Sequence, residues 1–237
     1  CLRLGPTPLP SGCRRLTTML ANAIQRPSPN FGVRRNGLQP SLIVLHYTAM
    51  DSAASALARL CDATSEVSAH YLITGLGEAF QLVAEDQRAW HAGQGEWHGL
   101  DDINSRSIGI ELDNRGNHPF SEPQMASLER LLQDIMNRWH ILPSGVIGHS
   151  DIAPGRKVDP GPRFDWARLA RLNLAGAGSS FDVGATPSPD QFSVAAQAAG
   201  FTANVDIDTL LMSTRLRFAP WRHGPLCAAD MDLCHRS

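Results

Sequence analysis

The stretch from Gly148 to Trp166, GHSDIAPGRKVDPGPRFDW, constrains the fold of this 237-residue chain more than any other. Its three prolines and three glycines exclude a continuous helix or a central strand, so we expect a loop with a fixed path. The loop brings His149, Lys157 and Asp159 within eleven positions of one another. An imidazole, an ammonium and a carboxylate on one loop suit a metal site with an electrophilic helper. A surface loop with ordinary charges is the alternative, and the rest of the chain decides between them.

Two apolar runs carry a polar side chain where a buried strand is expected. Residues 42–45 form a short continuous apolar segment that ends at His46, and sites on α/β sheets usually lie at strand ends. Glu111 interrupts a second apolar strand over residues 108–112, and glutamate is rarely buried without a partner. Glu111 is therefore a candidate acid, base or ligand. The alternatives are a core histidine at His46, and a structural carboxylate at Glu111 that pairs with a cation such as Arg106.

The remaining pattern alternates strands with helices and so indicates an α/β fold. Residues 67–73 and 79–83 flank a glycine-rich turn and predict a hairpin. A short strand over residues 146–148 leads to His149. Polar capping residues indicate where helices start. Cys61 lies in the helix expected after Asp51 or Ser52 and is expected to be a core thiol. Helices are expected after Asp51 or Ser52, after Ser121 as far as Trp139, over residues 164–174, after Ser188 as far as Gly200, and after Asp206.

The composition shifts suggest four segments. We expect an irregular N-terminal segment over residues 1–30, a main domain over 31–175, a linker over 176–186 and a small helical module over 187–237. Every candidate site residue precedes the linker. Deletion of the residues after Ser180 is therefore expected to leave the site intact.

Charge and cysteine content exclude several classes of protein. A net charge of −2 gives no basic footprint, so we expect no nucleic-acid partner, and no apolar run reaches membrane-spanning length. The five cysteines are odd in number and lack a CxxC spacing, so we expect neither a disulfide framework nor a cysteine zinc site. The first residue, Cys1, is compatible with a processed lipoprotein or with a start at Met19, and we favour Met19.

His46, His149 and Asp159 together satisfy the needs of a catalytic zinc site. Such a site takes three protein ligands and leaves a fourth position for water. Glu111 can accept a proton from that water, and the Lys157 ammonium can stabilise the oxyanion formed when an amide is attacked. The sequence therefore predicts one bound Zn²⁺ and a hydrolytic reaction.

Five motifs in the same order resemble the zinc-dependent N-acetylmuramoyl-L-alanine amidases of the AmpD and AmiD type. This family also includes phage T7 lysozyme and is similar to peptidoglycan-recognition proteins. The resemblance covers about residues 40–170. The motifs are LHYT at 45–48, SAHYLI at 68–73, RAWHAG at 88–93, NSRSIGIEL at 104–112 and the stretch at 148–166.

The resemblance implies a fold, a reaction and a set of roles. The fold is a mixed central β-sheet flanked by helices, and the reaction hydrolyses the bond between N-acetylmuramic acid and L-alanine. His46, His149 and Asp159 match the zinc ligands, Glu111 the general base and Lys157 the group that stabilises the transition state. The substrate groove matches Trp90, His91, Ala92, Gly93 and Asn104. The phage branch differs, with Cys in place of Asp159 and Tyr in place of Ala69.

The expected partner is peptidoglycan or an (anhydro)muropeptide, bound by a monomer during wall turnover or recycling. The segment after the linker is similar to the small C-terminal module of AmiD-type enzymes, which is related to peptidoglycan-binding domains. A recognition module that binds muropeptide without hydrolysis is the alternative, as is a zinc hydrolase that acts on another amide. Retention of all five catalytic positions favours the amidase. Cytoplasmic recycling and a periplasmic or lipoprotein role both stay open, and we favour the cytoplasm.

Overall fold

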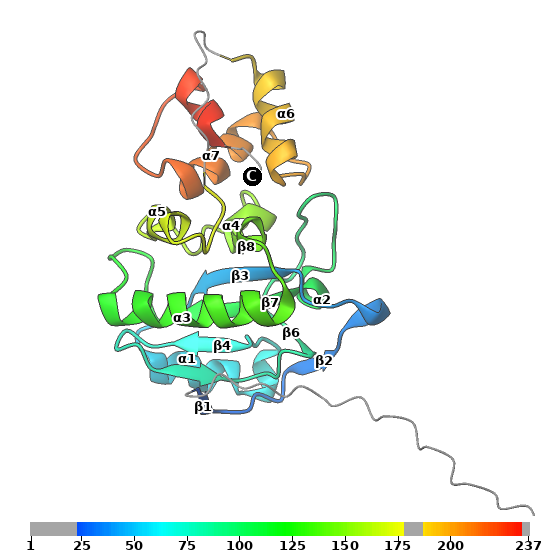
Figure 1. Cartoon of the computed structure of the whole chain (residues 1–237), viewed down its shortest axis with the longest axis vertical. Helices are drawn as coiled ribbons and strands as arrows, with labels where there is room; N and C mark the ends of the chain where they lie inside the picture. The colour runs from blue at the N-terminus through cyan, green and yellow to red at the C-terminus, as the bar shows by residue number, and fades with distance from the viewer. Residues whose placement is uncertain (1–22, 178–186, 234–237) are drawn as a thin grey trace, which may run out of the picture.

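The computed structural model describes residues 23–177 and 187–233, which form a mixed β-sheet with helices around it (Figure 1). The strands are β1 Ile24–Gln25, β2 Phe31–Val33, β3 Leu42–Tyr47, β4 Tyr71–Ile73, β5 Ala79–Gln81, β6 Gln87–Ala89, β7 Ser107–Leu112 and β8 Val146–Gly148. The α-helices are α1 Ala53–Leu60, α2 Ile103–Arg106, α3 Glu122–Trp139, α4 His149–Ile152, α5 Trp166–Arg171, α6 Pro189–Ala199 and α7 Ile207–Phe218. Short 3-10 turns lie at Arg35–Gly37, Ala63–Ser65, Pro143–Gly145 and Ala228–Leu233.

The main sheet has six strands in the order β1-β5-β4-β7-β3-β8. Strands β4, β7, β3 and β8 run parallel, β5 is antiparallel to β4, and β1 is parallel to β5. Strands β2 and β6 form a separate antiparallel pair. The mixed α/β fold predicted from the sequence is therefore confirmed.

The helix starts follow the predicted capping residues. The side chains of Ser52, Ser121, Ser188 and Asp206 each accept a hydrogen bond from the backbone N–H three positions later. These side chains satisfy N–H groups that have no partner within the helix, which is why polar residues mark helix starts. Helix α6 ends at Gly200, whose φ of 116° lies in the region that favours glycine.

Several elements differ from the prediction. The strand expected over residues 67–73 forms only at β4, because Ser68 bonds to Trp90 and Asn30 instead of to a neighbouring strand. Helix α5 is shorter than expected, and Cys61 is only partly buried because it caps the end of α1. Strand β1 pairs with β5, so the sheet begins before the boundary expected at residue 31.

The sheet buries different side chains on its two faces. Along β3, Ile43 and Leu45 belong to the core formed with α3, whereas Leu42 and Val44 face the other side. Successive side chains of a strand alternate between faces, so His46 lies on the same side as Val44. This second face carries the candidate site.

Helices α6 and α7 share a core with the second face of the sheet. Phe192, Phe201 and Leu211 are buried in one cluster with Val44 and Ile147. Figure 1 shows these helices together beyond the β8 edge. Removal of the C-terminal segment would uncover this cluster, and this packing argues against the expectation that its deletion leaves the site intact.

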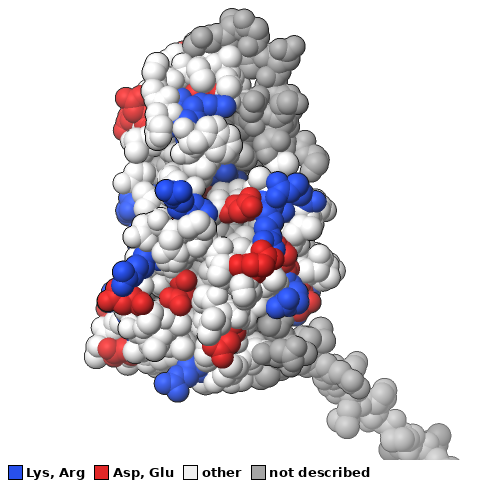
Figure 2. Space-filling view, turned by 90° about the vertical axis from the view of Figure 1, so that its left-hand side faces the viewer, with Lys and Arg blue, Asp and Glu red and all other residues white. Residues whose placement is uncertain are grey.

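Some sequence-based expectations lie outside the described residues, namely those on Cys1, on Met19 and on most of the linker. Within the described ranges, Cys61 and Cys227 are free thiols. None of the helices found there is long and apolar enough to span a membrane. On the face shown in Figure 2, basic and acidic side chains are interspersed among uncharged ones.

Candidate active site

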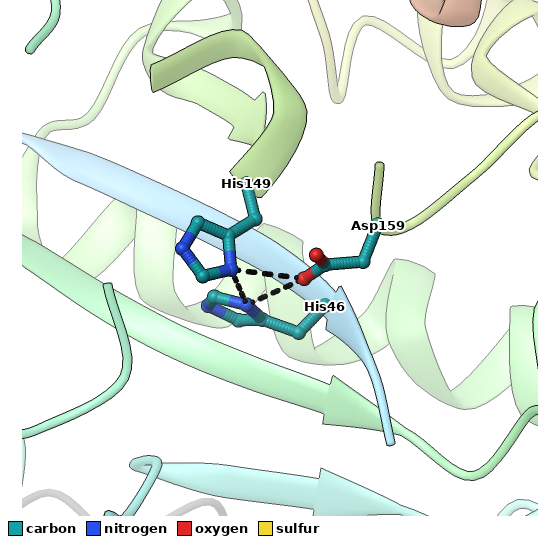
Figure 3. A group of neighbouring side chains, drawn as sticks. All are labelled: His46, His149 and Asp159. Atoms are coloured by element: carbon teal, nitrogen blue, oxygen red, sulfur yellow. Dashed lines mark hydrogen bonds and ion pairs between the residues drawn. The ribbon is translucent and has the colours of Figure 1, made fainter. Parts of the chain in front are cut away.

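Three predicted ligands converge at the carboxyl ends of two neighbouring strands. His46 lies near the end of β3, and His149 begins α4 directly after β8, the strand that pairs with β3. Asp159 lies on the loop that follows α4, and the backbone N–H of Ser150 donates to the carbonyl of Asp159 at 2.9 Å. This hydrogen bond closes the loop and brings Asp159 to the two histidines (Figure 3).

The three side chains present one atom each to a common point. His46 Nδ1 lies 3.0 Å from His149 Nδ1 and 2.9 Å from Asp159 Oδ2, and His149 Nδ1 lies 3.0 Å from the same oxygen. All three residues are buried. Two imidazoles and one carboxylate, all within 4.8 Å, could hold a metal ion. Three ligands leave a tetrahedral ion one open position, as catalytic metal sites require.

The protonation of the cluster favours metal binding. Burial, and then the neighbouring His149, lower the pKa of His46 to about 4, so its ring is neutral at physiological pH. Burial alone would raise the pKa of Asp159, but hydrogen bonds with His149 and His46 outweigh it and hold that pKa below the usual range. Metal ligands must be deprotonated, and His46 and Asp159 already are near neutral pH.

Glu111 faces the same point from the adjacent strand. It is paired in register with His46 across β3 and β7, so both side chains lie on the same face of the sheet. Its Oε2 is inaccessible to solvent and has no hydrogen-bond partner among the described residues. Burial, followed by the nearby Asp159 charge, raises the pKa of Glu111 to about 8, while Lys157 opposes the rise. Arg106 donates instead to the carbonyl of Asp101, so the ion pair considered as an alternative does not form.

A cavity of about 390 Å³ joins these groups. Its lining includes the five candidate catalytic and ligand residues, together with Trp90 and His91. The other three residues predicted to bind substrate do not line it. Of those three, Ala92 and Asn104 are buried and Gly93 is exposed. Further lining residues that the sequence reasoning did not single out include Tyr47, Arg59 and Arg156.

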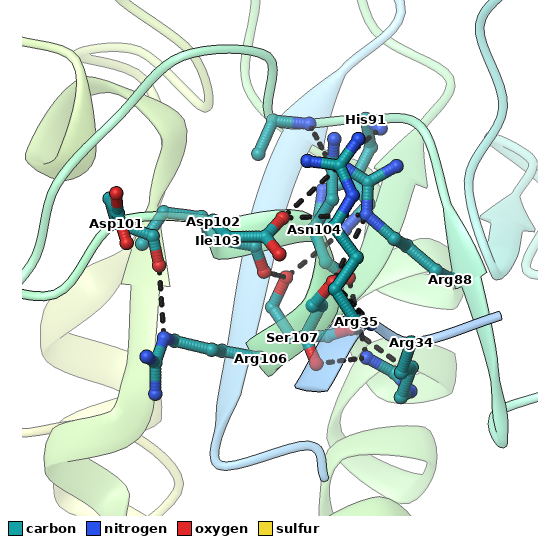
Figure 4. A network of polar contacts seen from close by, with 12 residues as sticks. Arg34, Arg35, Arg88, His91, Asp101, Asp102, Ile103, Asn104, Arg106 and Ser107 are labelled. Carbon is teal, nitrogen blue, oxygen red and sulfur yellow. Dashed lines mark hydrogen bonds and ion pairs between the residues drawn. The ribbon is translucent and has the colours of Figure 1, made fainter. Parts of the chain in front are cut away.

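Two buried residues beneath the site also escaped the sequence reasoning. Arg34 donates to the carbonyls of Glu85, Ser105 and Ser107, as Figure 4 shows in part. His70 is fully buried, and burial followed by the Arg34 charge lowers its pKa to about 3. His70 lies in the SAHYLI motif, which could have indicated its importance. Nothing in the sequence near Arg34 indicates the partners of that residue.

Comparisons with known proteins identify relatives of this chain. A family model described as N-acetylmuramoyl-L-alanine amidase matches residues 36–162. The chain is 44% identical over 149 residues to the N-acetylmuramoyl-L-alanine amidase AmiD of Escherichia coli, covering 56% of this chain and 53% of AmiD. The aligned part thus spans about half of that relative. It is also 35% identical over 170 residues to the 1,6-anhydro-N-acetylmuramyl-L-alanine amidase AmpD of Citrobacter freundii, covering 65% of this chain and 91% of AmpD.

A solved structure extends the likeness to the three-dimensional fold. The structure of E. coli AmiD in complex with anhydro-N-acetylmuramic acid-L-Ala-D-gamma-Glu-L-Lys aligns with a TM-score of 0.73 at 32% identity. The alignment covers 84% of this chain and 88% of that one. The structural likeness therefore extends beyond the segment matched by the family model.

Proposed function

This chain belongs to the N-acetylmuramoyl-L-alanine amidase family, and we propose that it is a zinc-dependent enzyme that hydrolyses the amide between N-acetylmuramic acid and L-alanine in muropeptides. The observation that carries the proposal is the convergence of His46, His149 and Asp159 with Glu111 and Lys157 around one cavity. The AmiD relative was solved with an anhydromuropeptide, which supports the same substrate class here.

The donor set suits zinc. Two imidazole nitrogens and one carboxylate oxygen are ligands that zinc takes in hydrolytic sites, and they leave a divalent ion with a net positive charge. Zinc bound there supplies Lewis acidity and lowers the pKa of water to near neutrality. All the proposed ligands come from one chain, which supports the monomer as the active unit.

Glu111 is proposed as the general base. Glu111 would be held as a carboxylate by a divalent cation at the three ligands, whose charge would oppose the effect of burial on its pKa. The unpartnered Oε2 then accepts a proton from the water whose oxygen bonds to the muramic acid carbonyl carbon. As the C–N bond breaks, the same carboxyl group returns the proton to the L-alanine nitrogen.

Lys157 is proposed to stabilise the oxyanion formed on the carbonyl oxygen. It lies two positions before Asp159 on the site loop and lines the cavity. A fixed positive charge at the place where negative charge develops lowers the activation barrier, and removal of such a group typically costs about 10²–10³-fold in rate.

The substrate groove combines an aromatic surface with positive charge. Trp90 lines the cavity and supplies an apolar face for the sugar or the peptide, and Arg59 and Arg156 line it as well. Their guanidinium groups suit the carboxylates of a stem peptide. A recognition module without activity is less well supported, because the cavity retains every group that hydrolysis needs.

Mass spectrometry of muropeptide digests tests the proposal. The zinc-loaded protein is incubated with muropeptides that carry or lack the 1,6-anhydro end, and the expected products are a lactyl-carboxylate sugar and a free peptide with an L-alanine amino terminus. Protein treated with a chelator is the control and should release neither product. Tight binding of intact muropeptide without cleavage would instead support the recognition module.

A further inference from the structure

His91 contacts a proposed metal ligand with one ring nitrogen and the sheet with the other. Its Nδ1 lies 3.0 Å from His46 Nε2, and its Nε2 lies 3.2 Å from Ser107 Oγ. Ser107 Oγ in turn donates to the carbonyl of Ile103 at 2.6 Å. The three hydrogen bonds form a continuous chain from the metal-binding cluster to α2, and Figure 4 shows the part between His91 and Ile103.

The carbonyl at the end of this chain determines the direction of every hydrogen bond in it. A carbonyl oxygen only accepts, so the Ser107 hydroxyl uses its proton there and accepts from His91 Nε2–H. A neutral His91 then has a lone pair on Nδ1, which accepts from His46 Nε2–H. His46 is left with a lone pair on Nδ1, the atom that faces His149 and Asp159.

The next residue, Ala92, orients the second histidine in the same way. Its carbonyl lies 2.9 Å from His149 Nε2, so this nitrogen donates and the lone pair of His149 lies on Nδ1. Asn104 fixes the dipeptide itself, because its Oδ1 accepts from the backbone N–H of both His91 and Ala92, at 3.1 and 2.9 Å. Residues 91 and 92 therefore contact both imidazoles at Nε2, the ring nitrogen on the side away from the proposed metal.

Gly109 provides the space for the His91 ring. It lies on the site face of β7, between Ser107 and Glu111, and a Cβ atom placed on it would lie 2.4 Å from His91 Cγ. No side chain can occupy that space while the ring keeps its position. Because residue 109 has no side chain, the His91 ring can take the orientation that reaches His46.

On the basis of the zinc site proposed above, we propose that the His91–Ala92 dipeptide, fixed by Asn104, positions both metal-binding histidines with Nδ1 toward the ion. His91 is then a positioning residue rather than a substrate contact. Hydrogen bonds behind a ligating histidine fix its tautomer and ring orientation, and their loss typically weakens metal affinity by about 10–100-fold.

Zinc affinity of three variants, measured by competition with a chelator, tests this role. His91→Phe keeps a ring but removes both nitrogens, so its zinc dissociation constant should rise by about 10–100-fold. His91→Asn places an acceptor oxygen at the δ position and should recover most of the affinity. His223→Phe, at an exposed histidine of the C-terminal region, is the control and should bind zinc like the wild type. Melting of the metal-free proteins shows whether each variant is folded.

The tautomer itself can be measured without any substitution. In ¹⁵N imidazole spectra of the zinc-loaded wild type, His46 and His149 should each carry a proton on Nε2 and bind zinc through Nδ1. Binding through Nε2, or wild-type zinc affinity in a folded His91→Phe protein with only a raised KM, would overturn the positioning role. If the wild type neither binds zinc nor cleaves muropeptide, the proposed function fails instead.

Discussion

A buried ion pair joins the last long helix to the loop of the candidate site. Arg217 on α7 donates from Nη1 to Asp151 Oδ2 at 2.7 Å and from Nη2 to the carbonyl of Val146 at 3.0 Å. The two charged side chains are 4% and 0% exposed. Asp151 lies two residues after His149 and also accepts from the N–H of Gly148 at 2.8 Å. The pair therefore fastens α7 to the turn that presents a proposed ligand.

The substitution Arg217→Met is expected to lower the free energy of unfolding by about 3–5 kcal/mol. Methionine keeps much of the length of the side chain but leaves the Asp151 carboxylate buried without its partner, and removal of one member of a buried pair typically costs that amount. For a chain of this length each kcal/mol lowers the melting temperature by about 2–4 °C. The melting temperature should therefore fall by about 6–20 °C.

Urea unfolding of the zinc-free proteins, followed by circular dichroism, measures this change. Arg115→Met is the matched control, because Arg115 pairs with Asp51 at the surface, where the side chains are 54% and 86% exposed. Such pairs contribute up to about 1 kcal/mol. A loss below about 1 kcal/mol in Arg217→Met would show that the buried pair contributes no more to stability than a surface pair. The double variant with Asp151→Leu should lose less than the two single losses added together, because no charge then remains unpaired.

Three further outcomes are expected. Asp159→Ala should lose most of its zinc because two ligands hold this metal poorly, and full occupancy in metal analysis would contradict the assignment. Deletion of residues 178–237 should cause aggregation or a lower melting temperature, since Phe201 and Leu211 pack on the sheet; a truncated protein that is soluble in gel filtration and melts at the wild-type temperature would contradict this. Burial opposes ionisation of Asp230, but hydrogen bonds from Arg215 outweigh it and hold its pKa at about 2. The resulting stability is present above pH about 4 and is lost as the pH falls toward 2. Asp230→Asn should therefore lose less unfolding free energy than the wild type across that range, and an equal loss in acid titration would argue against the pair.

The parts of the fold that the sequence predicts are those with local causes. The apolar run that ends at His46 and the caps at Ser121 and Ser188 are short patterns, and each forms the expected element. The residues of the candidate site could be predicted for a similar reason. Two of its ligands lie in one stretch rich in proline and glycine, His46 ends an apolar run, and Glu111 interrupts another.

The contacts that support the site join residues that are far apart in the sequence. Arg34 bonds to carbonyls more than 50 positions away, and Arg217 reaches Asp151 across 66 positions. No periodicity or spacing near either arginine indicates such partners. The RAWHAG motif indicated the neighbourhood of the site, but only the packing of His91 over Gly109 shows that its ring points to His46.

Zinc content and kcat, measured on one preparation of Glu111→Gln, test whether Glu111 acts as the base beside a zinc ion held by three other side chains. The amide is nearly isosteric with the carboxylate but cannot accept the proton of the attacking water. We predict one zinc per chain, an unchanged melting temperature and KM, and a kcat lower by about 10²–10⁴-fold. A zinc-loaded variant with a kcat near that of the wild type would show that Glu111 is not the base.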